Sequence, residues 1–132
     1  MTWVPAAVAL AYSQHRKQYQ EYVRHGLKFL ADNLWDANHG GFVDRTDAAG
    51  RPDRQLMPWK QMYSLAFGIY AAAGAYQSTG DRKALDLAKA AFRWIDRHAH
   101  DPEHGGYFEH LTAEGRRWRW TFRTKNSARG CR

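Results

Sequence analysis

The 132-residue chain has one cysteine, Cys131, and lacks any long apolar run. A single cysteine excludes an internal disulfide framework and a cysteine-based zinc site. A membrane-spanning helix needs roughly 20 apolar residues in a row, and no run reaches that length. The apolar start "MTWVPAAVALAY" has no basic leader and no clear cleavage site, so we interpret it as a helix rather than a signal peptide. These absences predict a reducing, cytoplasmic setting without a membrane partner.

Acidic residues are missing from the C-terminal end of the chain. Residues 1–115 contain 13 basic and 13 acidic residues, whereas residues 116–132 contain seven basic residues and no acidic one. A basic tract with interleaved Trp and Phe is one pattern of nucleic-acid binding. Because the rest of the chain is balanced, we predict no nucleic-acid partner. We expect residues 119–132 to be a basic tail, a non-native extension or the start of a further helix.

A loop-like segment occurs twice, 65 residues apart. Residues 36–51 and 101–116 are identical at 7 of 16 positions, including an Asp, a His-Gly-Gly turn and a Gly-Arg pair. A repeat of this period is typical of stacked or ring-like arrays of similar units. The Gly-Gly pairs allow a tight turn. Phe42-Val43 and Tyr107-Phe108 have strand-like composition, which predicts short β-hairpin-like crossover loops.

Helical stretches of two kinds alternate with these loops. Residues 3–12 and 59–76 are apolar or small on nearly every side, whereas residues 19–34 and 84–99 are amphipathic. In 84–99 the apolar stripe is expected to contain Leu85, Ala88, Phe92 and Ile95. A helix that is apolar all round must be covered all round. The spacing of Phe67 and Tyr70 predicts that they lie in the core. The alternation predicts an all-α fold of repeated helical hairpins, with a plain four-helix bundle as the alternative.

The connection "STGD" between residues 59–76 and 84–99 carries its own signals. Gly80 is placed to end one helix in a left-handed conformation. Asp81 is placed to cap the N-terminus of the next helix. We expect the apolar helices to form an inner layer that the amphipathic helices cover as an outer layer. The short connection therefore leads from an inner to an outer helix, and the long repeated segments lead back.

Three stretches resemble the N-acylglucosamine 2-epimerase and cellobiose 2-epimerase family of sugar isomerases. They are "FLADNLWDANHGGF", "GRPDRQLMPWKQMYSLAFGIYAAAGAYQSTGD" and "HDPEHGGYFE", in the order that the family has them. The resemblance covers roughly residues 3–118. It implies a partial (α/α)6 barrel, a toroid of helical hairpins, with about two repeats in residues 1–118. It also implies that the chain is a truncated or frame-shifted product.

The resemblance implies proton transfer next to a sugar carbonyl. A base removes the proton from C2 of the open sugar, and the enediolate is reprotonated on the other face of C2 or at C1. This chemistry needs no cofactor and no metal, and two histidines would suit it as bases. The family places its histidine pair in later repeats. We therefore expect a fragment of a sugar 2-epimerase or aldose–ketose isomerase that is inactive, or nearly so, alone.

Three residues are candidates to bind a mono- or disaccharide. Tyr63 matches a family aromatic that lines the sugar pocket, and Trp3 matches the Trp of an Arg-x-x-Trp pattern whose Arg would fall before Met1. Lys60, one turn before Tyr63, could contact a sugar oxygen. The alternatives are core packing for Tyr63 and Trp3, and for Lys60 a salt bridge that anchors the crossover loop, which we favour.

Other polar residues are expected to have structural roles. Because a histidine recurs at the same place of both loops, as His39 and His104, we predict a local structural role in the turn rather than catalysis. The histidines at 98, 100, 104 and 110 lack a metal-binding spacing, so no metal site is predicted. The loop carboxylates are expected to be solvated or to cap turns. The alternative is that two of them form the acidic pair of a glycoside hydrolase, and the candidates are Asp36, Asp44, Asp101, Glu103 and Glu109.

Two other readings of the function stay open. One is a fragment of another α/α-toroid carbohydrate enzyme, a hydrolase or a lyase. The other is a non-catalytic helical module that self-associates. Whatever the function, truncation is expected to leave faces of the inner helices bare. Because exposed apolar patches drive association, we predict a homo-oligomer.

Overall fold

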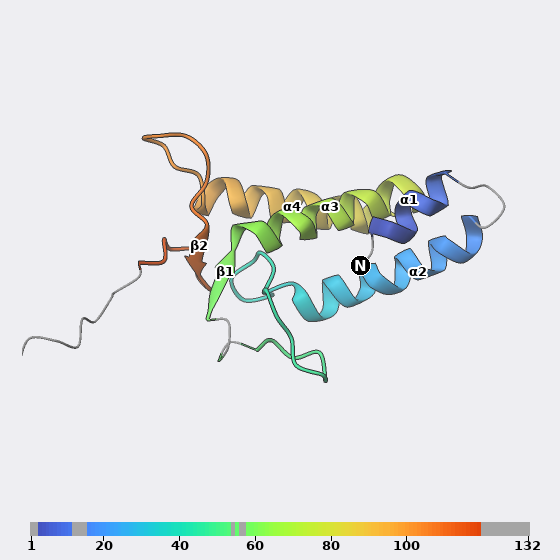
Figure 1. The fold of residues 1–132 in the computed structure, drawn as a ribbon, viewed down its shortest axis with the longest axis horizontal. Coiled ribbons are helices and arrows are strands. Elements are labelled where there is room, and N and C mark those ends of the chain that lie inside the picture. The colour runs from blue at the N-terminus through green and yellow to red at the C-terminus, as the bar shows by residue number, and fades with distance from the viewer. Residues whose placement is uncertain (1–2, 12–15, 54, 56–57, 120–132) are drawn as a thin grey trace, which may run out of the picture.

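The computed structural model describes residues 3–11, 16–53, 55 and 58–119, without the side chains of Trp3 and Val4. Within these residues the chain is mostly helical, as predicted, with two short strands (Figure 1). In chain order the elements are α1 (Trp3–Ala11), α2 (Arg16–Phe29), the π-helical turn η2 (Leu30–Leu34), β1 (Trp59–Gln61), α3 (Met62–Thr79), α4 (Arg82–His98) and β2 (His110–Thr112). None of the helices described is both long and apolar enough to cross a membrane.

The helices form two hairpins. Hairpin 1 consists of α1, α2, η2 and the first crossover loop, residues 36–51, and hairpin 2 consists of β1, α3, α4 and the second crossover loop, residues 101–116. Helix α3 is central, because it packs against α1, α2 and α4. Figure 1 shows the two strands beside the crossover loops, at one end of the helices. The structure has the predicted order of inner and outer helices.

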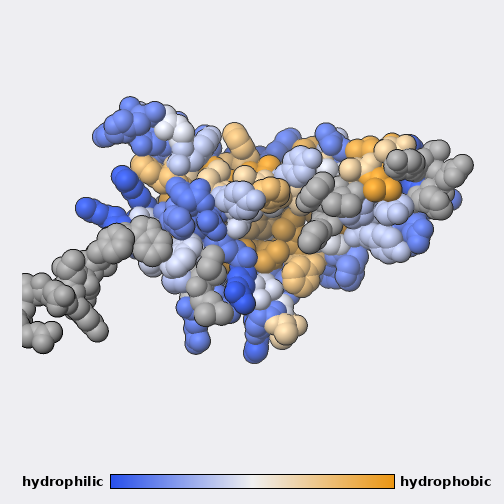
Figure 2. All heavy atoms as spheres, viewed as in Figure 1, coloured by the Kyte–Doolittle hydropathy of each residue, from blue (hydrophilic) through white to orange (hydrophobic). Residues whose placement is uncertain are grey.

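The two faces of α3 differ in the size of their side chains. The buried face is made mainly of small residues: Leu65, Gly68, Ala71, Ala72, Ala75 and Ser78. On the other face Phe67 and Tyr70 are 45% and 59% exposed, so their predicted place in the core is wrong for this chain. The cause is that α1, α2 and α4 all pack on the small-residue side. Hydrophobic residues accordingly reach the surface along the middle of the molecule (Figure 2).

The connection from α3 to α4 has the predicted capping. Gly80 has a φ of 73°, which only glycine adopts readily. The Asp81 carboxylate accepts a hydrogen bond of 2.9 Å from the Lys83 amide. The stripe predicted for α4 is wrong at Phe92, which is 53% exposed. Trp94 is buried instead, because it covers the first crossover loop.

Helix α3 begins three residues later than the sequence predicts. Residues 59–61 form strand β1, which pairs antiparallel with β2, with Lys60 opposite Leu111. The Trp59 ring lies 5.9 Å from the His110 ring and 5.5 Å from the Trp118 ring, so it packs on the second crossover loop. The expected strand residues Phe42 and Tyr107 form only isolated bridges, to Trp35 and His100.

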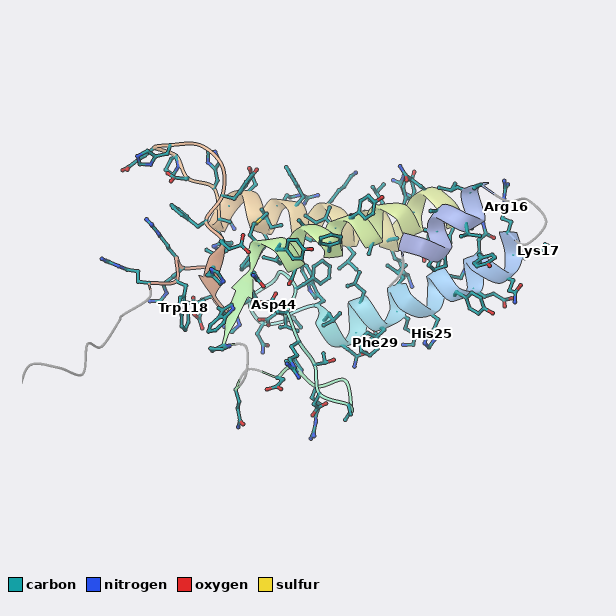
Figure 3. All side chains as sticks on the ribbon, viewed as in Figure 1. Arg16, Lys17, His25, Phe29, Asp44 and Trp118 are labelled. Carbon is teal, nitrogen blue, oxygen red and sulfur yellow. The ribbon has the colours of Figure 1, made fainter. Side chains whose placement is uncertain are left out.

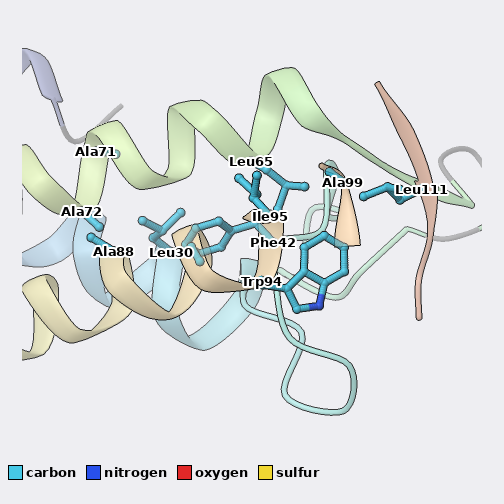
Figure 4. Close-up of a cluster of buried hydrophobic side chains, with 11 residues drawn as sticks. Leu30, Phe42, Leu65, Ala71, Ala72, Ala88, Trp94, Ile95, Ala99 and Leu111 are labelled. Atoms are coloured by element: carbon cyan, nitrogen blue, oxygen red, sulfur yellow. The ribbon is translucent and has the colours of Figure 1, made fainter. Parts of the chain in front are cut away.

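The core joins the two hairpins near the crossover loops. Its main cluster contains Leu30 and Phe42 of hairpin 1 and nine residues of hairpin 2 (Figure 4): Leu65, Ala71, Ala72, Ala88, Ala91, Trp94, Ile95, Ala99 and Leu111. Phe42 lies against Gly68, where an added Cβ would come within 2.4 Å of the ring. The close approach of the first loop to α3 therefore depends on a glycine.

This contact predicts that replacing two different glycines of α3 by alanine has opposite effects on the stability of the chain. Gly68→Ala should destabilise the chain by roughly 1–3 kcal/mol, because the methyl group overpacks the core against Phe42. Gly74→Ala is the control, since among the described residues its Cβ would meet only Ala6, at an ordinary 3.5 Å. It should stabilise the helix by about 0.5–1 kcal/mol. Urea unfolding measures both, and equal stability of the two variants would contradict the packing described.

Candidate functional site

The ammonium group of Lys60 is buried where the two crossover loops meet β1. It lies 3.0 Å from Asp36 Oδ2, and both side chains are 2% exposed. It also donates to the carbonyl oxygens of Gly40 and, at 2.8 Å, of Ala113. The Trp94 ring lies 4.7 Å away, a cation–π distance. Lys60 therefore joins the first loop to the second, as in the salt-bridge alternative that we favoured.

The first crossover loop is folded around the Asp36 carboxylate. Its Oδ1 accepts hydrogen bonds from the amides of Asn38 at 3.1 Å and His39 at 3.2 Å. The Trp94 indole closes the turn by donating to the His39 carbonyl at 2.6 Å. Gly40 has a positive φ of 73°, and a Cβ there would come within 2.7 Å of the Trp94 ring. The turn thus needs glycine at this position for two reasons: the backbone has a positive φ, and a side chain would collide with the indole of Trp94.

The histidines of the two loops have the structural place that the repeat predicts. The amides of His39 and His104 each donate at 3.2 Å to the carboxylate three residues earlier. Their Nδ1 atoms lie 3.4 Å from the other oxygen of the same carboxylate. Within residues 3–11, 16–53, 55 and 58–119, no group of three or more His, Cys, Asp or Glu side chains could hold a metal ion.

Tyr63 lies in the first turn of α3, three residues after Lys60. Its side chain is 64% exposed, and its ring centroid is 4.9 Å from that of Phe67. Tyr70 continues the same helix face, so the three rings form an exposed aromatic stripe on an inner helix. The alternative of core packing is therefore wrong for Tyr63 in this chain. Trp3 begins α1, and its side chain lies outside the described residues.

Asp44 is a feature of the site that sequence reasoning treated only as one loop carboxylate among several. Its Oδ2 accepts a hydrogen bond of 2.9 Å from the Gln61 amide, where α3 begins (Figure 3). Burial raises the pKa of this carboxyl above its usual value, and the bonds from Gln61 and Ser64 oppose the rise only in part. Its Oδ1 is buried and has no hydrogen-bond partner among the described residues. Asp44 thus supports the helix turn that carries Tyr63.

A groove beside the aromatic stripe separates α2 from α3. It has a volume of about 490 Å³, and its lining includes His25, Phe29, Asp44, Ser64, Phe67 and Ala71. The groove brings one ring of the stripe and the Asp44 carboxylate to the same surface. An apolar wall with a few convergent polar groups is the usual composition of a small-molecule site.

Trp94 is the residue of this site that sequence reasoning missed. Its role depends on a contact with residues 39–41, more than 50 positions earlier in the chain. The repeat held a usable signal, because Phe29 stands 65 residues before Trp94 and both are aromatic. The repeated aromatic residue on the outer helix could have indicated that its ring packs on a Gly-Gly turn, as Trp94 packs on Gly40 and Gly41.

The buried position of Lys60 predicts a large loss of stability when it is replaced. Lys60→Met should cost roughly 3–5 kcal/mol, because it removes the buried ammonium group that pairs with the buried Asp36 carboxylate. The control is Lys28→Met, which removes an exposed lysine paired with Asp32. That change should cost only about 0–1 kcal/mol.

Chemical unfolding of the single variants and of the Lys60→Met/Asp36→Asn double variant measures these losses in the free energy of unfolding. The double variant should recover part of the stability that Lys60→Met loses, since it also removes the negative charge of Asp36. Equal stability of Lys60→Met and Lys28→Met would contradict the role of Lys60.

Comparison with known proteins supports the family resemblance. Residues 3–128 match the N-acylglucosamine 2-epimerase (GlcNAc 2-epimerase) family. The cellobiose 2-epimerase of Bacteroides fragilis is 33% identical over 99 residues, which are 75% of this chain and 24% of that protein. The cellobiose 2-epimerase of Ruminococcus albus is 34% identical over 96 residues, or 73% and 23% of the two chains. The chain thus spans about a quarter of the length of these relatives.

Solved structures agree with the fold. The structure of cellobiose 2-epimerase from Spirochaeta thermophila superposes with a TM-score of 0.78 at 33% identity, over 86% of this chain and 27% of that one. A D-mannose isomerase structure has a TM-score of 0.73 at 16% identity, over 89% and 29% of the two chains, and shares the fold. The two hairpins are therefore part of an α/α toroid, and the chain belongs to the N-acylglucosamine 2-epimerase family.

Proposed function

We propose that the chain forms part of the sugar-binding wall of a sugar 2-epimerase or aldose–ketose isomerase. The observation that carries the proposal is the aromatic stripe Tyr63, Phe67 and Tyr70 on inner helix α3, which leaves three rings exposed. Aromatic rings on an inner helix of a toroid offer flat apolar faces to the C–H face of a sugar. The relatives named above, cellobiose 2-epimerases, act on a disaccharide, which supports a mono- or disaccharide substrate.

Within this wall Tyr63 is the proposed substrate contact. Its ring is the most exposed of the three, and its hydroxyl group adds a hydrogen-bonding end that Phe67 lacks. Trp3 stays a second predicted contact. Lys60 is a positioning residue in this proposal, because its ammonium group is buried between the loops and the first turn of α3 follows it directly.

The proposed reaction needs groups that this chain is not expected to supply. One base removes the C2 proton of the open-chain sugar, the electrons pass to the carbonyl oxygen, and a second group returns a proton to C2 or C1. Among the described histidines, His39 and His104 are engaged in their own turns, which supports bases from other repeats. No observation favours the hydrolase alternative, since Asp36 is paired with Lys60.

The location and assembly of the chain belong to the same proposal. A reducing, cytoplasmic setting follows from the single cysteine. A homo-oligomer follows from apolar side chains left exposed on both inner helices, Leu10 on α1 and the aromatic stripe on α3.

The test uses the 132-residue chain with cellobiose and with mannose in D₂O. Saturation-transfer NMR should show sugar binding, and mass spectrometry should show no deuterium at C2 of the sugar, because the bases lie in other repeats. Robust exchange at C2 would contradict that placement of the bases. Release of glucose from cellobiose would favour a hydrolase, and the absence of binding would contradict the sugar-binding wall.

Two variants at one position separate the ring of Tyr63 from its hydroxyl group. Tyr63→Ala should abolish the saturation-transfer signal, whereas Tyr63→Phe should weaken it less, because the stacking face stays. The side chain is 64% exposed, so both variants should fold, which circular dichroism checks. Equal sugar binding by all three proteins would remove Tyr63 from the site.

A further inference from the structure

Helix α3 begins without a capping side chain of its own. Its N-cap residue, Gln61, makes no side-chain hydrogen bond to the helix, whereas Asp81 caps α4 with its own carboxylate. The start of a helix leaves several backbone amides without partners inside the helix. The first turn of α3 must therefore be held by residues from other parts of the chain.

The two crossover loops supply these partners. The Gln61 amide donates to Asp44 Oδ2 at 2.9 Å, and the Met62 amide donates to the Glu109 carbonyl oxygen at 2.8 Å. The Ser64 side chain also hydrogen-bonds the Asp44 carboxylate. Figure 3 shows Asp44 beside the start of α3. Asp44 therefore bonds to the first turn at two points, on either side of the tyrosine that we propose as the sugar contact.

The direction of the Tyr63 ring depends on the backbone of this turn. The side chain is 64% exposed, and its ring packs on Phe67, 4.9 Å away on the next turn of the same helix. The backbone directs a largely exposed side chain more than its neighbours do. A binding residue of this kind needs support from the hydrogen bonds around it. Loosening of residues 61–64 should therefore move the ring.

The Asp44 carboxylate lies in mostly apolar surroundings. It lines the groove between α2 and α3, together with Phe29, Phe42 and Phe67. Burial raises the pKa of the Asp44 carboxyl above its usual value, because the charged form is less well solvated there. Asp44 should therefore take up a proton at a higher pH than an exposed aspartate does.

Titratable or charged groups near Asp44 come from three neighbouring elements. They are His25 on α2, Lys60 on β1, and Glu109 and His110 at the start of β2. His110 lowers the Asp44 pKa and Glu109 raises it, both by less than burial does. The Lys60 ammonium group is paired with another carboxylate, that of Asp36. The charge of Asp44 is thus controlled mainly by its burial.

We infer that Asp44 is a positioning residue for the sugar contact, and that its negative charge holds the first turn of α3 in the orientation that directs Tyr63. A carboxylate accepts hydrogen bonds more strongly than a neutral carboxyl group, and a negative charge is favourable at a helix N-terminus. Protonation of Asp44 weakens its bonds to Gln61 and Ser64, and the turn that carries Tyr63 loosens. The inference rests on the proposed function for the role of Tyr63, but the coupling of Tyr63 to Asp44 does not.

An NMR titration of the 132-residue chain tests this coupling without any sugar. The ¹³C resonance of the Asp44 carboxyl group reports its midpoint in the wild-type chain. The Gln61 amide proton and the Tyr63 ring protons should shift with that same midpoint, and Asp44→Asn should abolish both shifts. Asp47→Asn is the matched control on the same loop, because the Asp47 carboxylate hydrogen-bonds residues 49 and 51 of its own turn. It should leave both shifts unchanged.

Saturation-transfer NMR with cellobiose at a series of pH values tests the effect on binding. As the pH falls through the Asp44 midpoint, the wild-type affinity should drop roughly three- to tenfold, the difference between a hydrogen bond to a charged and to a neutral acceptor. Asp44→Asn should bind weakly at neutral pH and lose nothing further over this range. Ser64→Ala keeps the charge but loses one bond, so its affinity should be intermediate and should still depend on pH.

The contrary results are equally definite. A Tyr63 ring that does not shift at the Asp44 midpoint overturns the inference. A Tyr63 shift that persists in Asp44→Asn belongs to a neighbouring group, His25, Glu109 or His110, and also overturns it. Equal effects of Asp44→Asn and of its control would assign the result to the fold of the loop instead of the charge.

Failure of the proposed function gives a different result. A wild-type chain that binds no cellobiose contradicts the sugar-binding wall, while the titration without sugar still decides whether Asp44 positions Tyr63. A thermal melt by circular dichroism checks the folding of each variant. Because the ¹³C titration uses the wild-type chain, it decides the coupling even if Asp44→Asn does not fold.

Discussion

The structure depends on one buried ammonium group. Lys60 enters from a three-residue strand and meets Asp36, the Gly40 carbonyl, the Ala113 carbonyl and the Trp94 ring. Removing a lysine and a carboxylate from water is costly unless they are paired and hydrogen-bonded. Here one amino group satisfies groups from both crossover loops, so burial of the pair fixes the two loops relative to each other.

The position of the candidate site follows from this arrangement. The Lys60–Asp36 ion pair fixes strand β1 to the first crossover loop, and backbone pairing with β2 fixes it to the second. Helix α3 starts directly after it, and Asp44 of the first loop accepts the Gln61 amide at that point. Because α1, α2 and α4 occupy the small-residue side of α3, the rings on its aromatic side are largely exposed. The stripe that we propose for sugar binding is thus oriented mainly by the packing of the small-residue side of the helix.

Features that depend on local residues could be predicted from the sequence, whereas features that depend on distant partners could not. The helical hairpins, the Gly-Gly turns, the Gly80 end and the Asp81 cap depend on local residues, and the structure has all of them. Strand β1 was missed, because the pairing of Trp59–Gln61 depends on residues 110–112. Phe67 and Tyr70 were expected to be buried from their spacing, but spacing cannot show that α1, α2 and α4 all pack on the small-residue side of α3. Phe92 was expected in the buried stripe of α4, where Trp94 is buried instead. Trp94 was missed because its partners lie in another hairpin.

The two crossover loops offer an internal comparison for the central claim that Lys60 and Trp94 hold the first loop. The amides of Gly40 and Gly105 make the same hydrogen bond, at 2.7 and 3.0 Å, to the carbonyl of the Asp four residues earlier. Within the part of the chain that the structure describes, only the first loop is covered by Lys60 and Trp94. Native-state hydrogen exchange of these two amides, at a concentration that keeps the chain monomeric, tests the claim most directly. The account predicts far slower exchange at Gly40, and loss of that difference in Lys60→Met with Gly105 unchanged. Equal exchange at the two glycines of the wild-type chain would contradict it.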